Sequence, residues 1–164
     1  MKSLIAFVFG LIALPALLLI AGVFGWLPSN ATAEPPKWES SMGMQVLDAS
    51  LEKRSARLSN TIAGTDTVAL AAGGKIYADK CAGCHGSAKG PSAWGAKGFY
   101  PRAPQFFQEG SDVSAPEAFT AIHDGIRYSG MGAWRDLMSD ADTWKVANFV
   151  ASLQPKGGEE KDMD

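Results

Sequence analysis

The chain contains only two cysteines, and they stand close together directly before a histidine, in Cys81-Ala82-Gly83-Cys84-His85. This spacing is typical of covalent attachment of a c-type haem, in which both thiols form thioethers and the imidazole binds the iron. Two residues between the thiols place both sulfurs on one side of a helical turn, matching two vinyl groups on one porphyrin edge. We therefore predict one haem c, held by Cys81 and Cys84, with His85 as an axial ligand.

Three other roles compete for this pair of cysteines. A thioredoxin-like redox pair requires a βαβ setting, which the sequence pattern does not show. Zinc would have four candidate ligands in Cys81, Cys84, His85 and His123, but a structural zinc finger places its histidines about 3–5 residues apart. A disulfide across two residues would be strained. The haem interpretation is favoured over all three.

The second axial position either takes another side chain or stays open. The candidates are Met131, Met138, His123 and Lys97. Met131 stands between two glycines, which would let the backbone fold close beneath the porphyrin. Met138 adjoins the predicted final helix and is interpreted as packing. We predict Met131 as the ligand, because a methionine in a polar, glycine-rich loop makes a poor core residue.

Closing both axial positions has a functional consequence. A histidine and a soft thioether together favour reduced iron, and they raise its reduction potential relative to that of an iron held by two imidazoles. A six-coordinate iron leaves no position for a substrate, so electrons are expected to pass through the exposed haem edge. We therefore predict an electron carrier, and no catalysis by this chain alone. A net charge of −2 argues against a nucleic-acid partner, which selects basic surfaces.

The periodicity of apolar residues predicts an all-α domain. Helices are expected over residues 46–58, 67–79, 116–125 and 140–153. Ser139 or Asp140 is expected to cap the last of these helices. Residues 86–116 carry several prolines and little periodicity, and are expected to form a long loop that wraps the haem. The acidic tail, residues 156–164, is expected to be disordered.

Residues 4–27 form an uncharged apolar run at the start of the chain. As a helix this run would span about 36 Å, enough for a hydrocarbon core of about 30 Å. Lys2 precedes the run, so the positive-inside rule predicts that the chain beyond it lies outside the cytoplasm. The alternative is a signal peptide, because Ala-Thr-Ala at residues 31–33 is similar to a small-residue cleavage site before Glu34. We favour the uncleaved anchor.

The expected segments follow from these observations: an anchor or signal peptide (1–27), a linker with a short amphipathic helix (28–66), a haem domain (67–155) and a tail (156–164). We expect a single pass through the inner (cytoplasmic) membrane, with the haem domain in the periplasm. Cleavage after Ala33 would instead give a soluble periplasmic protein.

About half of the chain, residues 67–155, resembles the single-haem class I c-type cytochromes. Gly73 and Tyr77 are similar to that family's first-helix pair, where a glycine lets two helices cross closely beside an aromatic ring. The facing positions on the final helix are Trp144, Val146 and Phe149. The stretch from Ile126 to Trp134 is similar to the family's methionine loop, with glycine instead of the common proline after Met131.

The resemblance implies the class I cytochrome c fold and electron transfer. It also implies that a proline carbonyl holds the second nitrogen of His85, with Pro104 as first choice and Pro101 as second. Trp134 would lie against the haem, bond a propionate or belong to the core.

The donor and the acceptor of electrons stay open. Exported carriers of this kind serve quinol-oxidising complexes, terminal oxidases or dehydrogenases. The first role is a carrier of single electrons between respiratory partners on the outer face of the membrane. The alternative is a fixed haem subunit of an oxidase, quinol-oxidising or dehydrogenase complex. A haem sensor or peroxidase, which needs an open sixth position, is the third role.

Overall fold

The computed structural model describes the backbone of residues 2–153, and the side chains of residue 7 and residues 9–153. The chain divides into two compact units, Met1–Ala33 and Glu34–Asp164. The described residues contain helices and no strand, apart from an isolated bridge between Ser87 and Gly90. The predicted all-α fold class is thereby confirmed. The predicted disordered tail, residues 156–164, lies outside the described residues.

The first unit contains one helix, α1 (Lys2–Val23), with Pro15 inside it. Its described apolar side chains are exposed, as Leu11, Leu14 and Leu19 illustrate. In the part of the chain that the structure describes, no helix is long and apolar enough to cross a membrane.

The second unit begins with a helix that is longer than predicted. Helix α2 (Lys37–Ser55) begins before the helix that the sequence predicted over residues 46–58. Pro36 stands just before the helix, with extended backbone angles, and the next proline along the chain is Pro91. Leu51 and Ser55 are buried, and α2 packs against α6. Residues 34–66 therefore belong to the second compact unit, whereas the sequence predicted a linker over residues 28–66.

The cysteine motif forms the end of a run of three short helices, α3 (Thr67–Ile76), the π-helical turn η1 (Tyr77–Cys81) and α4 (Ala82–His85). Asp66 starts α3, because its carboxylate accepts hydrogen bonds from the backbone nitrogens of Val68 (2.9 Å) and Ala69 (3.1 Å). The sequence predicted one helix over 67–79. The π-turn widens the helix just before Cys81, a distortion that is frequent at functional sites.

Three more helices complete the unit, α5 (Phe106–Glu109), α6 (Ala115–Asp124) and α7 (Asp140–Ala151). Helix α5 lies inside the stretch that was predicted to be only loop. Ser114 and Glu117 form a capping box at the start of α6. Ser139, one of the two predicted caps, accepts a hydrogen bond from the backbone nitrogen of Asp142 (3.2 Å).

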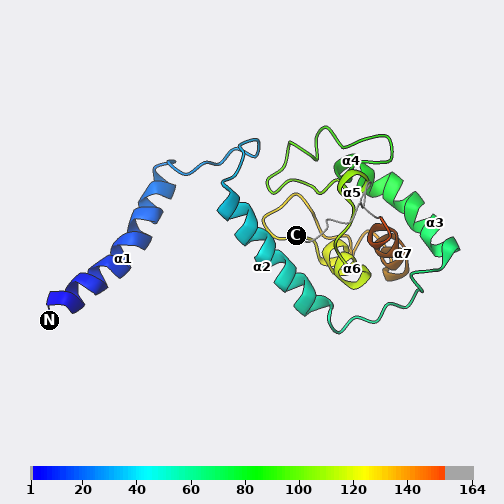
Figure 1. The fold of residues 1–164 in the computed structure, drawn as a ribbon, viewed down its shortest axis with the longest axis horizontal. Helices are drawn as coiled ribbons and strands as arrows, with labels where there is room; N and C mark the ends of the chain where they lie inside the picture. The colour runs from blue at the N-terminus through cyan, green and yellow to red at the C-terminus, as the bar shows by residue number, and fades with distance from the viewer. Residues whose placement is uncertain (1, 154–164) are drawn as a thin grey trace, which may run out of the picture. The chain divides into compact units, whose positions relative to one another are not determined.

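The core forms where α3 and α7 cross and where α6 packs on α7 (Figure 1). A Cβ atom on Gly73 would lie 2.2 Å from the carbonyl oxygen of Lys145 and 3.0 Å from the Cβ of Phe149. Only glycine therefore permits this crossing. The close helix pair that the resemblance implied for Gly73 is present in the structure.

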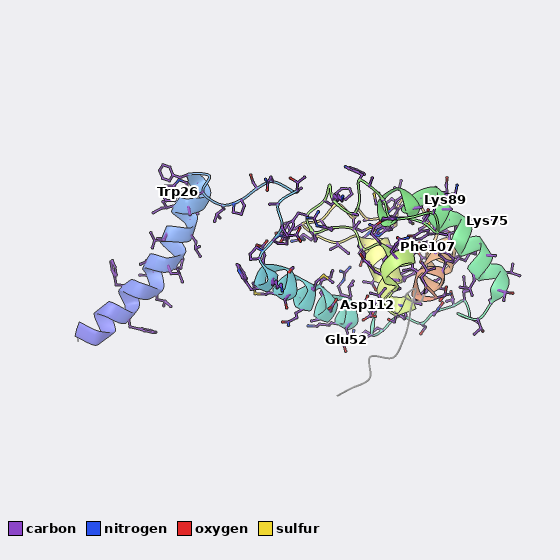
Figure 2. All side chains as sticks on the ribbon, turned by 45° about the horizontal axis from the view of Figure 1, so that its top comes forward. Trp26, Glu52, Lys75, Lys89, Phe107 and Asp112 are labelled. Atoms are coloured by element: carbon purple, nitrogen blue, oxygen red, sulfur yellow. The ribbon has the colours of Figure 1, made fainter. Side chains whose placement is uncertain are left out.

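Aromatic rings fill the space around the crossing. Tyr77 is 1% exposed, and its ring centre lies 5.4 Å from that of Phe149 and 5.6 Å from that of Phe107. Phe119 of α6 stacks on Trp144 of α7, with ring centres 4.3 Å apart. Figure 2 labels Phe107 within this domain, and it labels the exposed Lys75 and Lys89 on the surface.

One buried polar side chain holds the segment that precedes α3 against the core. Asn148 of α7 is 3% exposed. Its amide donates to the carbonyl of Ile62 (3.2 Å), and its carbonyl oxygen accepts from Asn60 (2.7 Å). The segment between α2 and α3 is thereby held against the domain.

Candidate haem site

The two cysteines reach the site on consecutive turns of η1 and α4. Both are free thiols and half-buried. Burial, together with the charge of neighbouring Cys84, raises the pKa of the Cys81 thiol to about 11, although Lys80 opposes this shift. Before haem attachment the Cys81 thiol is therefore protonated at neutral pH.

The imidazole of His85 is held by a backbone carbonyl. Its Nδ1–H donates to the carbonyl oxygen of Pro104 over 2.9 Å. This is the contact that the resemblance implied for Pro104, and it leaves the Nε2 lone pair free for a metal. Burial lowers the pKa of His85, and the bond to Pro104 only partly offsets this effect. The ring also stacks on Phe106, with centres 5.0 Å apart.

Three side chains fix the backbone of the cysteine motif. Ser92 Oγ donates to the carbonyl of Gly83 (2.6 Å). Gln105 donates to the carbonyl of Cys84 (3.0 Å). The Tyr77 hydroxyl lies 3.0 Å from the carbonyl oxygen of His85 and 3.1 Å from that of Gly86. These bonds anchor each turn of the motif.

Sequence reasoning missed Gln105 and Ser92. Gln105 is 4% exposed, and its carbonyl oxygen also accepts from the backbone nitrogen of Ser92 (2.7 Å). Both residues lie in a long loop without periodicity, so the only available signal was the position of Gln105 beside Pro104.

The predicted methionine loop is closed by its own hydrogen bonds. The backbone nitrogen of Ile126 donates to the carbonyl of Met131 (2.9 Å), and the nitrogen of Met131 donates to Ser129 Oγ (3.1 Å). The backbone nitrogen of Trp134 donates to the carbonyl of Ile122 in α6 (3.0 Å). These bonds hold the loop although Gly132 replaces the proline that the family often has there.

The methionine loop also contacts the loop that holds His85. A Cβ atom on Gly130 would lie 2.6 Å from the ring of Phe99. Glycine at this position therefore lets the two loops approach each other.

The four candidates for the second axial position have the following surroundings in the structure. Met131 is half-buried and packs against the core cluster that Cys81 also borders. Met138 packs against the same cluster and lies outside the methionine loop. His123 stacks on Phe119 and bonds Asp124 over 2.8 Å, and Lys97 is exposed.

Trp134, which the resemblance placed near the haem, is half-buried and packs against the core cluster. This position is compatible with each of the three roles considered for it. Pro101, the second choice for the carbonyl that supports His85, is exposed, and the contact to His85 is made by Pro104.

The donor set fits a covalent haem. Two free thiols are spaced by two residues, an imidazole has its Nδ1 fixed by a carbonyl, and a thioether lies on a closed loop beside the same core. Among the described residues, no group of three or more His, Cys, Asp or Glu side chains could hold a metal ion. Cys81 and Cys84 would hold the porphyrin, and His85 would bind its iron.

One comparison with known proteins identifies the family. The family model described as "Cytochrome C oxidase, cbb3-type, subunit III" matches residues 68–150. Comparisons with curated proteins and with solved structures give no match. The matched residues span half of the chain and include the cysteine motif, Pro104 and the methionine loop. The chain therefore belongs to the cbb3-type subunit III cytochrome family, and its helical domain is a c-type cytochrome.

Proposed function

We propose that this protein carries one covalent haem c and passes single electrons between respiratory redox partners. The observation that carries the proposal is the Cys81–Cys84–His85 motif with His85 Nδ1 bonded to Pro104. The number of haems follows from the cysteines, because the chain has only two. The bound group supplies an iron that changes its charge by one electron.

The chain's own residues set how that iron works. His85 presents a neutral nitrogen, because burial lowers its pKa and Pro104 keeps the proton on Nδ1. Met131 is proposed as the second ligand, supported by its closed loop and its position beside the core. With both positions taken, the protein would transfer electrons without binding a substrate at the metal.

Carbon monoxide tests the proposed coordination. The reduced wild-type protein is expected to bind carbon monoxide slowly, because Met131 must leave first. Met131→Ala should open the position and raise the binding rate by about a hundredfold or more, since a thioether bond worth a few kcal/mol no longer has to break. Met138→Ala, on the neighbouring packing methionine, is the matched control and should bind at the wild-type rate. Optical spectroscopy of the reduced protein measures both rates, and rapid binding by the wild type would favour the sensor or peroxidase role.

The alternative is a fixed haem subunit of an oxidase, quinol-oxidising or dehydrogenase complex. The description of the matching family, an oxidase subunit, favours this reading over a free shuttle. Extraction in mild detergent separates the two roles. A stoichiometric partner that co-purifies indicates a subunit, whereas isolation of the chain by itself indicates a shuttle.

The proposed location is the outer face of the inner membrane, with the haem domain in the periplasm. The support is the uncharged apolar run of residues 4–27 behind Lys2. Covalent haem attachment to exported chains agrees with this orientation. Sequencing of the first residues of the purified protein tests the anchor. A first residue at Glu34 would show cleavage after Ala33 and a soluble periplasmic protein.

A further inference from the structure

Helix α2 is bonded to the base of the methionine loop, through Asp124, and to the loop whose Pro104 holds His85, through Tyr100. It belongs to the same compact unit as these loops, and it runs alongside α6 (Figure 1). Its C-terminal part is held by Leu51, which is 4% exposed, and by Ser55, which is 7% exposed. The family match begins only after α2, at residue 68, so the family description does not account for this helix.

The last turn of α2 is bonded to the base of the methionine loop. Arg54 forms an ion pair with Asp124, the last residue of α6. Asp124 also accepts from Arg135 (2.9 Å), which follows the methionine loop, and from His123 (2.8 Å). The backbone nitrogen of Arg135 donates to the carbonyl of His123 (3.2 Å). Asp124 therefore joins α2 to both ends of the loop that carries Met131.

The charge of Asp124 is maintained by this arrangement. Burial by itself raises the pKa of Asp124, but the hydrogen bonds from His123 and Arg54 and the charges of Arg54 and Arg135 outweigh it. The net effect lowers the pKa of the carboxyl, so Asp124 stays ionised and keeps its partners.

The other end of α2 is bonded to the loop that holds His85. Glu39 in the first turn accepts a hydrogen bond from the Tyr100 hydroxyl. Glu34, just before the helix, pairs with Arg102 over 2.8 Å. Arg102 lies two residues before Pro104, whose carbonyl holds His85 Nδ1. The two ends of one helix thus contact the supports of both proposed ligands.

We propose that α2 is a strap across the haem site, in which Leu51, Arg54 and Glu39 position the two ligand loops. The inference rests on the proposed ligation by His85 and Met131. Each exposed ion pair contributes little by itself, so the buried Leu51 supplies most of the docking free energy and the polar contacts set the register. Docking of α2 and closure of the methionine loop are then linked, and each stabilises the other by the same factor.

Carbon monoxide binding to the reduced, full-length, haem-loaded protein tests the strap with matched pairs on one helix. Leu51→Ala removes the buried anchor and should raise the binding rate about tenfold, because the methionine loop opens more often. Val46→Ala truncates an apolar residue that is 66% exposed on the same helix and should leave the rate unchanged.

A second pair of substitutions, with smaller expected effects, controls for general destabilisation of the protein by Leu51→Ala. Arg54→Ala should raise the rate about two- to fivefold, as expected for the loss of one partly exposed ion pair. Arg57→Ala, in the turn after α2, removes the same charge from an exposed residue that forms no ion pair within the described part of the chain. It should behave as wild type. At the other end of α2, the carbon monoxide binding rate of Glu39→Gln is compared with that of Glu52→Gln, a substitution on the exposed side of the helix (Figure 2).

Amide hydrogen exchange gives a readout that does not depend on the haem spectrum. Met131→Ala should accelerate exchange in α2, because an open methionine loop no longer stabilises the docked helix, whereas α7 should stay protected. Faster exchange in α2 of Leu51→Ala, without any change in carbon monoxide binding, would overturn the strap alone. Rapid carbon monoxide binding by the wild type would instead overturn Met131 ligation, and with it the strap's role at the methionine.

Discussion

Replacement of His85 or Cys81 by alanine is expected to abolish accumulation of the haem-loaded protein in an exporting host. Each variant removes one bond to the haem, and in so small a domain the haem would supply much of the hydrophobic core. The loss is expected to exceed the stability of an ordinary domain, which is about 5–15 kcal/mol in total. Absorbance of the exported fraction, together with immunodetection of the chain, measures both haem and protein.

The second histidine of the chain provides the control for this experiment. His123→Ala removes an imidazole of the same size that is bonded to Asp124 and stacked on Phe119. This variant should accumulate with its haem and lose about 1 kcal/mol of stability through the hydrogen bond. Normal amounts of folded His85→Ala or Cys81→Ala protein would contradict the assignment of the site.

Gly73→Ala is expected to lower the free energy of unfolding by about 3 kcal/mol or more. The added methyl group would lie 2.2 Å from the carbonyl oxygen of Lys145, which is backbone and cannot rotate away. Helices α3 and α7 would have to separate, and the ring contact between Tyr77 and Phe149 would be lost. Chemical denaturation of the haem-loaded protein measures the change.

A glycine in α2 is the matched control for Gly73. A Cβ atom on Gly43 would meet nothing within 4 Å, so Gly43→Ala only exchanges a poor helix former for a good one. This substitution should be neutral or stabilising by up to about 1 kcal/mol. Equal stabilities of the Gly73→Ala and Gly43→Ala proteins would show that the helix crossing does not depend on the glycine.

The structure and the family match confirm the predicted all-α fold class and the predicted c-type cytochrome family. The order of residues in Cys81-Ala82-Gly83-Cys84-His85 specifies a covalent attachment because the geometry is local to one helical turn. The close approach at Gly73 could also be expected, since its position relative to the cysteines resembles a known family pair. The Pro104 carbonyl was the first of two choices, and the structure places it on His85 Nδ1.

Longer-range features were harder to predict. The helix before the haem domain was expected to begin at residue 46, because prolines and serines precede it, yet α2 begins at Lys37. Apolar periodicity did predict a helix over residues 46–58, which contains the buried Leu51. It gave no indication of Ser55, a small polar residue that is buried at the end of α2, the helix that packs against α6.

By itself, the sequence determined the cofactor chemistry and the helical class, because both depend on residues that are neighbours along the chain. Only the tertiary structure decided that α2 lies against the haem unit, that Gln105 and Ser92 hold the cysteine motif, and that Asp124 joins α2 to the methionine loop. These arrangements join residues far apart in sequence, as Arg54 and Asp124 are. Their free energy arises from burial and ion pairing that exist only after the chain has folded, so no local pattern encodes them.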